Sequence, residues 1–251
     1  IRSDGKNKIA MIYGGEPLLY FNIIQRLINL GRRKASLANK NISFNIATNG
    51  MLLTKKHLMF FNKNNIKISI SIDGEKETHD KYRVTKQHGP SYDIVSKKIR
   101  LAKKYIKKQN LIALFGVHQK EVNGMFKNFL HITKDLEIEN INIEPMQSDI
   151  WSDYEKQEFK KQLIKILNYT DKEMNKGHSL YINSINKFIK SNFENVVKEH
   201  PYYENIEVFH DGKITTNPFL YYEGDEYVIG DVFKGIDVSK NTSIGDKKKF
   251  I

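Results

Sequence analysis

Apolar residues recur along this chain in two alternating patterns. Short β-branched runs predict buried strands at residues 9–13, 43–47, 67–72, 111–117 and 140–144. Between them, apolar residues at helical spacing predict helices over residues 18–37, 54–64, 91–108 and 122–136. Such repetition is typical of parallel strands joined by right-handed crossovers. The pattern therefore predicts an α/β fold, either a doubly wound sheet or a complete or partial β/α barrel.

The alternation of short strands and helices ends after residue 150. Two helices are expected at residues 154–175 and 182–198. A β-rich tail follows, with strands predicted at residues 206–210, 213–216 and 226–229 and an Asp-Gly hairpin turn after the first of them. We therefore expect a domain at 1–150, a helical connection at 151–202 and a small β-rich extension at 203–251.

Unusual residues stand where the predicted strands end. Gly14-Gly15-Glu16-Pro17 follows the first strand, Thr48-Asn49-Gly50 the second and Asp73-Gly74 the third. Ligands of parallel α/β folds bind at the carboxyl ends of the strands. Two glycines allow a ligand to approach the backbone, and Glu16 can accept hydrogen bonds from a cationic amine. The alternative for each segment is a tight turn with solvated side chains.

The third strand carries a further signal. Ser69, Ser71 and Asp73 alternate with apolar residues and so share one face of the strand. Polar groups on an inward face need partners, and a bound polar ligand is the simplest one. Arg83, ten residues later, is a candidate bidentate clamp for a carboxylate. The alternative is a cluster of caps and salt bridges, with His79 as a satisfied surface group.

Composition narrows the classes of function. The chain of 251 residues has a formal net charge of +12, but its lysines are spread along predicted helix faces, as solvated lysines are. A specific polyanion site is the less favoured alternative. No apolar run is long enough for a transmembrane span and the start is polar, so a cytoplasmic location without membrane attachment is expected.

Four motifs occur in order at residues 14–17, 48–53, 71–74 and 79–83. They read Gly-Gly-Glu-Pro, Thr-Asn-Gly-x-Leu-Leu, Ser-Ile-Asp-Gly and His-Asp-x-x-Arg. This series resembles radical S-adenosylmethionine (SAM) enzymes. It is most similar to the subgroup with a C-terminal SPASM or twitch extension, which includes sulfatase maturases and peptide-modifying enzymes. The tail, at residues 208–214 and 228–232, resembles that extension. The fold implied is a partial (β/α)6 barrel lacking its first strand, with a small α+β extension.

The resemblance also implies roles for individual residues. Glu16, with the backbone of Gly14 and Gly15, would hold the SAM amino group, and Arg83 the SAM carboxylate. The remaining implied positions are Asn49 nearby, Ser71 and Asp73 near the ribose or the substrate, and Pro145 in a segment that contacts the adenine. Asp73 is also a candidate proton acceptor. The activity implied is generation of a 5′-deoxyadenosyl radical that modifies a peptide or protein.

The family's three cysteines, which hold a [4Fe–4S] cluster, have no counterpart here, because the chain contains no cysteine. Only 13 residues precede Gly14, so one interpretation places the cluster site upstream, in a full-length protein. The alternative is a cluster-free relative that binds SAM or a peptide, or acts as a scaffold. Thr215-Thr216-Asn217 stands where the subgroup has an auxiliary-cluster cysteine, which agrees with that alternative.

A third hypothesis, an unrelated α/β-barrel enzyme of sugar phosphates, lacks the expected glycine-rich phosphate loop. Nucleic-acid binding is not favoured, since the Trp and paired Tyr residues suit packing better than base stacking. The oligomeric state stays open. Four histidines show no metal-ligand spacing and are interpreted as structural or surface residues: His88, His118, His131 and His210.

Overall fold

The computed structural model describes residues 6–146, 149–184, 206–216 and 220–237. The chain divides into two compact units, Ile1–Lys187 and Phe188–Ile251, which we describe separately. Residues 151–202, expected as a connection, are shared between the two units. In the described part of the chain, no helix combines the length and apolarity needed to cross a membrane.

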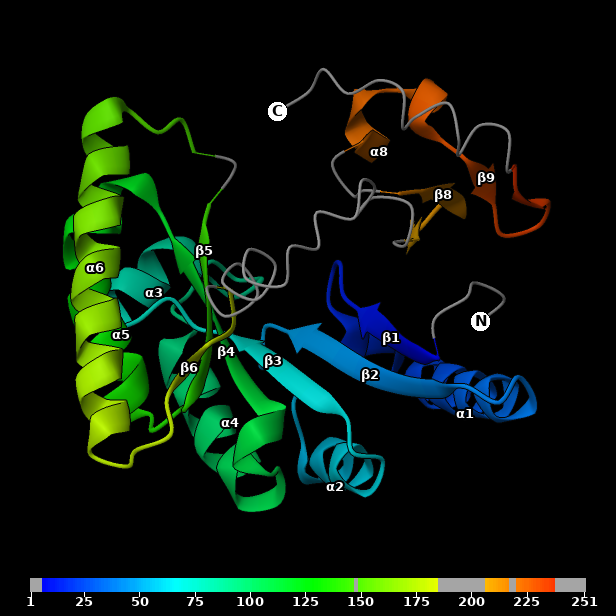
Figure 1. Cartoon of the computed structure of the whole chain (residues 1–251), viewed down its shortest axis with the longest axis horizontal. Helices are drawn as coiled ribbons and strands as arrows, with labels where there is room; N and C mark the ends of the chain where they lie inside the picture. The colour runs from blue at the N-terminus through cyan, green and yellow to red at the C-terminus, as the bar shows by residue number, and fades with distance from the viewer. Residues whose placement is uncertain (1–5, 147–148, 185–205, 217–219, 238–251) are drawn as a thin grey trace. The chain divides into compact units, whose positions relative to one another are not determined.

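The first unit is built on a six-stranded sheet, coloured from blue to yellow-green in Figure 1. Its strands are neighbours in chain order, and every neighbouring pair is parallel. A doubly wound sheet would reverse its order once, so the sheet is of the barrel type. The expected fold class, a partial β/α barrel, is confirmed. The strands are β1 (Asn7–Ile12), β2 (Asn41–Thr48), β3 (Lys67–Ser71), β4 (Leu111–Val117), β5 (Asn140–Pro145) and β6 (Tyr181–Ile182).

Helices cover one face of this sheet. Phe44 of β2 lies against Gly31 of the first helix, and Ile70 of β3 and Val95 of a later helix both lie next to Gly50. Side chains alternate along a strand, so the neighbours of these residues lie on the opposite face. The helices are α1 (Phe21–Leu37), α2 (Lys55–Lys63), α3 (Lys76–Tyr82), α4 (Tyr92–Tyr105), α5 (Met125–Leu130) and α6 (Asp153–Asn175).

Local signals explain where two of these helices begin. Thr54 and His57 form a capping box before α2, and Ser152 and Glu155 form another before α6. Helix α6 contributes Ile166 to the core that contains the sheet residues. The long helix expected after residue 150 therefore packs onto the barrel unit.

The opposite face of the sheet, the inner face, carries polar side chains among apolar ones, since the strand registers also place Ile9, Met11, Ile112 and Leu114 on it. Alternation places Ser43 and Asn45 of β2, Ser69 and Ser71 of β3 and Asn142 of β5 on it. Ser43 is exposed, Asn45, Ser71 and Asn142 are partly buried, and Ser69 is buried. The polar side chains on the inner face of a partial barrel lie where a polar ligand can bind.

Two expected helices differ from the prediction. Residues 122–136 are helical but not uniformly α, since 3-10 helix η3 (Gln119–Gly124) leads into α5 and a π-helical turn (His131–Asp135) follows it. The helix expected to start at Ile182 is wrong at its start, because Ile182 pairs with Ile141 as the last strand of the sheet. Its remainder from 185 onward lies outside the described residues.

The second unit contains a four-stranded antiparallel sheet in the order β10-β9-β8-β7. The Asp-Gly turn joins β7 to β8 as predicted, with Gly212 at φ +86°. The strand expected at 226–229 is wrong, because a 3-10 helix (Asp225–Tyr227) occupies its first half and β9 starts at Gly230. The elements are β7 (Glu207–Val208), β8 (Lys213–Thr215), α8 (Leu220–Glu223), β9 (Gly230–Asp231) and β10 (Gly235–Ile236).

Candidate functional site at the strand ends

The first predicted site segment links β1 to a 3-10 turn (Pro17–Tyr20). Gly14 and Gly15 have φ values of +89° and +55°, a backbone region that costs glycine little. Both are exposed, and a methyl group added at either would meet no atom within 4 Å. The chain thus presents open backbone at the carboxyl end of β1.

The Glu16 carboxylate ties this loop to the next strand. Its Oε1 accepts hydrogen bonds from the Thr48 hydroxyl (2.7 Å) and the Leu18 amide (3.1 Å). Its Oε2 accepts one from the Asn49 amide (2.8 Å). The side chain is partly buried, and a carboxylate has about four acceptor sites, so it retains capacity for a further donor.

Asn49 caps its own turn. Its Oδ1 accepts a hydrogen bond from the Met51 amide (2.9 Å), and Gly50 follows at φ +80°. The Gly50 amide donates to the Thr48 hydroxyl (3.0 Å), which in turn donates to Glu16. This segment is therefore the Asn-Gly turn that the sequence offered as an alternative, and it also orients Glu16.

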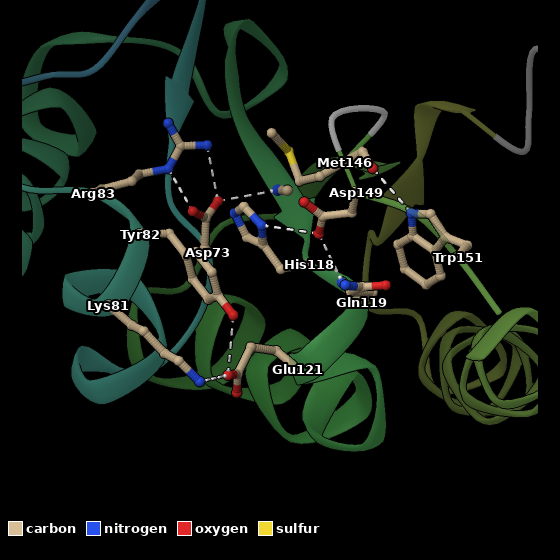
Figure 2. Close-up of polar contacts among 11 residues, drawn as sticks. Asp73, Lys81, Tyr82, Arg83, His118, Gln119, Glu121, Met146, Asp149 and Trp151 are labelled. Atoms are coloured by element: carbon tan, nitrogen blue, oxygen red, sulfur yellow. Dashed lines mark hydrogen bonds and ion pairs between the residues drawn. The ribbon is translucent and has the colours of Figure 1, made fainter. Parts of the chain in front are cut away.

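The second acidic site residue is completely buried. Asp73 receives two hydrogen bonds from Arg83, from Nε to Oδ2 (2.5 Å) and from Nη2 to Oδ1 (3.0 Å), and Oδ1 also accepts from the Gly116 amide (3.1 Å). Figure 2 shows this fork. Both oxygens are occupied and the carboxylate is inaccessible. The geometry therefore favours Asp73 as the counter-ion of Arg83 over the expected proton acceptor.

His79 belongs to the same cluster as Asp73 and Arg83. It is fully buried, so the alternative that interpreted His79 as a surface group is wrong. The Asp73 amide donates to Nδ1 (3.3 Å), Nε2 lies 3.0 Å from the Ser91 hydroxyl, and that hydroxyl donates to the Arg83 carbonyl (2.6 Å). Burial is the main cause that lowers the pKa of His79 to about 4, opposed by Asp73 and assisted by Arg83. A neutral His79 therefore fixes the backbone on both sides of the ion pair.

Gly116 and Met146 border the same pair. A methyl group at position 116 would lie 3.0 Å from Met146 Sδ and 3.1 Å from Asp73 Oδ1. Met146 follows Pro145, the last residue of β5, and its amide donates to the Val117 carbonyl (2.9 Å). The end of β5 is thereby joined to the end of β4 beside the guanidinium of Arg83.

The structure thus groups the predicted residues into two corners. Glu16, Asn49 and the two glycines form the Glu16 corner, at the ends of β1 and β2. Asp73 and Arg83 form the Asp73 corner, at the ends of β3 and β4. Among the described residues, no hydrogen bond joins the two corners. Ser71, partly buried on β3, lies on the inner face of the sheet, and Pro145 is exposed at the end of β5.

Several residues to which the sequence assigned no binding role of their own belong to these corners. Thr48 and Gly116 hold carboxylates, while His79 supports the ion pair. His118, just beyond β4, pairs with Asp149 and stacks on Tyr82 (Figure 2). The only sequence signal for His118 is its place directly after a strand end.

Iron–sulfur ligands are not available from this chain. The sequence has no cysteine, and among the described residues no three His, Asp or Glu side chains gather as a metal site requires. The donor set of this chain therefore does not fit a [4Fe–4S] cluster.

Curated relatives match the same part of the chain. A cysteine-type anaerobic sulfatase-maturating enzyme of Clostridium novyi is 30% identical over 118 residues, 46% of this chain and 31% of that protein. A serine-type counterpart of Bacteroides thetaiotaomicron is 33% identical over 141 residues, 56% of this chain and 33% of that protein. The radical SAM cyclopropyl synthase TigE of Paramaledivibacter caminithermalis is 27% identical over 128 residues. The matches span a third or less of the relatives' lengths.

A solved structure has the same fold. The structure described as native anSMEcpe with bound AdoMet superposes with a TM-score of 0.80 at 18% identity, covering 98% of this chain and 71% of that chain. At that identity the likeness concerns the fold alone.

A family model settles the membership. The model described as the radical SAM superfamily matches residues 2–128, which is half of the chain and includes both corners up to β4 and α5. The order of motifs and the sheet topology agree with it. The chain belongs to the radical SAM superfamily.

Proposed function

We propose that this chain is the SAM-binding part of a radical SAM enzyme that modifies a peptide or protein. The observation that carries the proposal is the Glu16 corner, where a carboxylate with spare acceptor capacity adjoins open glycine backbone. It lies at the carboxyl end of parallel strands, where such folds bind ligands. The family match supports the same conclusion.

Glu16 and the glycines suit an ammonium group. Three donors hold the Glu16 carboxylate in place, so it does not have to be ordered when a cation arrives. The positive-φ glycines leave their backbone accessible beside it. We propose that this corner binds the SAM amine and that Asn49 contributes through its turn.

Arg83 suits the SAM carboxylate. Asp73 occupies Nε and one hydrogen of Nη2, which leaves the Nη1 hydrogens to reach a ligand. Its side chain is 30% exposed, whereas that of Asp73 is buried. In this proposal Asp73 orients Arg83, Ser71 faces the ribose or the substrate, and Pro145 borders the adenine. Bound SAM supplies the 5′-deoxyadenosyl group whose radical abstracts a substrate hydrogen in this family.

The substrate class rests on relatives. Those matched here are named for sulfatase maturation and cyclopropane synthesis, and one solved neighbour is described with bound AdoMet and a Kp18Cys peptide. The serine and asparagine side chains on the inner face of the sheet offer donors and acceptors to such a peptide. We also propose that the protein is cytoplasmic.

A second candidate is a cluster-free module that binds SAM or a peptide without radical chemistry. The absence of cysteine from all 251 residues favours it. Iron and sulfide content of the protein from its complete reading frame, purified without oxygen, separates the two candidates. About four of each per chain supports the enzyme, and none after reconstitution supports the module.

Calorimetry with S-adenosylhomocysteine tests the SAM site without any cluster. The Glu16→Gln variant keeps the shape of the side chain and removes its charge, so we expect roughly tenfold weaker binding, about 1.4 kcal/mol. Glu139→Gln is the matched control, because Glu139 pairs with Lys108 near the amino ends of the strands. Equal affinity in both variants would contradict the proposed site.

A further inference from the structure

His118 stands at the rim of the strand ends. It is the first residue after β4 and keeps an extended backbone, with φ −81° and ψ 145°. Residues two apart on an extended chain share a face, so His118 lies on the face of Gly116. Gly116 contacts the Asp73–Arg83 pair. His118 therefore lies one step farther out along the same face.

A carboxylate orients the imidazole. His118 Nδ1 lies 3.2 Å from Asp149 Oδ2, and the Gln119 amide donates to the same oxygen (3.0 Å), as Figure 2 shows. An ionised carboxylate only accepts hydrogen bonds, so Nδ1 carries the proton. In the neutral ring this leaves the Nε2 lone pair as an acceptor.

An aromatic ring fixes the plane of the imidazole. Tyr82 stacks on His118 with ring centroids 3.5 Å apart and an angle of 7°. The Tyr82 hydroxyl donates to Glu121 (3.4 Å), which also pairs with Lys81. Burial, more than the nearby Glu121, raises the pKa of Tyr82, so the ring stays a neutral phenol. The imidazole is thus held at one nitrogen and on one face.

The other nitrogen has no partner among the described residues. No hydrogen bond there uses His118 Nε2, and the side chain keeps 13% of its surface exposed. Buried His79 shows the opposite arrangement, since both of its nitrogens lie within hydrogen-bonding distance of protein groups. An oriented acceptor left open to solvent is expected of a binding group rather than of a packing group.

We propose that His118 Nε2 is a binding subsite that accepts a hydrogen bond from an N–H, O–H or S–H group of the substrate, with Asp149 as its positioning residue. The inference rests on the proposed function. We assign the donor to the substrate because His118 lies farther out along the strand than Gly116, which borders Arg83. Arg83 is where the SAM carboxylate is proposed to bind. The cofactor's own N–H and O–H groups are the other source of such a donor.

The ligand-free part of the test is a measurement of the histidine tautomer. In the ¹⁵N-labelled chain, imidazole spectra above the titration range should show His118 in the Nδ1–H form. Asp149→Asn should shift it toward the Nε2–H form, which the free histidine side chain prefers. His178 pairs with Glu173 through Nδ1 (2.7 Å) but is exposed and distant from the strand ends, and it serves as the internal control. An Nε2–H tautomer in the unmodified chain overturns the inference.

The ligand part uses S-adenosylhomocysteine, then N-acetyl-serinamide and N-acetyl-cysteinamide added to that complex. A shift of His118 Nε2, a signal assigned by its absence from His118→Gln, with an amino-acid amide and without a matching shift of His178 supports the substrate subsite. A shift of His118 Nε2 with S-adenosylhomocysteine alone assigns the subsite to the cofactor and overturns the substrate assignment.

The same spectra separate this inference from the proposed function. If the backbone amides of Gly14 and Gly15 shift with S-adenosylhomocysteine while His118 shifts with no probe, the inference fails and the proposed function stands. If S-adenosylhomocysteine does not bind, the proposed function fails. The two amino-acid amides added without it then decide whether His118 is a binding subsite.

Discussion

Glu16 and Asp73 both follow a parallel strand, yet their surroundings differ. Glu16 is partly buried and accepts hydrogen bonds from two amides and a hydroxyl, none of them charged. Asp73 is completely buried, and a guanidinium takes up both of its oxygens. The Glu16 carboxylate can still bind a cation from solvent, whereas the Asp73 carboxylate is already paired with Arg83. The comparison shows that position at a strand end does not decide a carboxylate's role, and that its existing partners do.

The largest effect is expected from Asp73→Ala. The change leaves the Arg83 guanidinium and the Gly116 amide without their acceptor. Because Arg83 reaches solvent in part, we expect a loss of roughly 3 kcal/mol, at the lower end for a broken buried pair. Urea denaturation measures it. A loss no larger than that of Glu16→Ala would remove the distinction between the corners.

The Asp73 corner should also weaken in acid, through His79. Its folded pKa of about 4 lies below the unfolded value of 6.5, so the unfolded state takes up the proton first. Stability is therefore complete above about pH 6.5 and falls as the pH drops toward about 4, by roughly 3 kcal/mol. Urea titrations across this range should show a flatter profile for His79→Gln. Parallel profiles would mean that His79 protonates equally in both states.

Thr48→Val sharpens the comparison at the Glu16 corner. It removes one donor to Glu16 and the acceptor of the Gly50 amide but keeps the shape of the side chain. We expect about 1 kcal/mol less stability and about threefold weaker S-adenosylhomocysteine binding. Calorimetry and urea denaturation measure the two effects. Full affinity would show that Glu16 needs no such support.

Gly116→Ala inserts a methyl group between the Asp73 carboxylate and Met146. The carboxylate is pinned by Arg83, so the flexible Met146 has to move. We expect a loss of about 1 kcal/mol, the lower end for an overpacked site. The double variant Gly116→Ala with Met146→Ala should recover stability relative to Met146→Ala alone. No recovery would place the clash at Asp73 instead.

The smallest effect is expected at the surface. Lys76 and Asp93 form an exposed pair that raises the pKa of Lys76 through a hydrogen bond. Exposed pairs contribute little, so Asp93→Asn should leave the urea midpoint unchanged within error. A clear change in the urea midpoint would show that charge alone, rather than burial, explains the stability loss expected for Asp73→Ala.

Sequence patterns predicted the parts of the fold that repeat. Five of the sheet strands and helices α1, α2, α4 and α6 lie where apolar spacing placed them. Helix α3 was missed because Lys76–Tyr82 is short and polar, with no apolar period to reveal it. Ile182 was assigned to a helix because two strand residues give too short a pattern to recognise.

The site was predictable as a set of positions and less so as a set of contacts. The residues at the strand ends were correctly expected together at one edge, since parallel strands end at the same edge. That Arg83 meets Asp73, and that His79 is buried beneath them, depends on the packing of α3. That His118 is oriented depends on Asp149, 31 residues later in the chain. Contacts of this kind leave no trace in local sequence patterns.

The central claim is that the strand ends of this chain bind SAM, and a map of backbone amide shifts on adding S-adenosylhomocysteine tests it most directly. The account predicts shifts at Gly14, Gly15 and Gly116, with none in the cavity of about 710 Å³ lined by Lys103, Glu137 and Glu173 among others near the amino ends of the strands. Shifts confined to that cavity or to residues 206–237, or no shifts at saturating ligand, would contradict it.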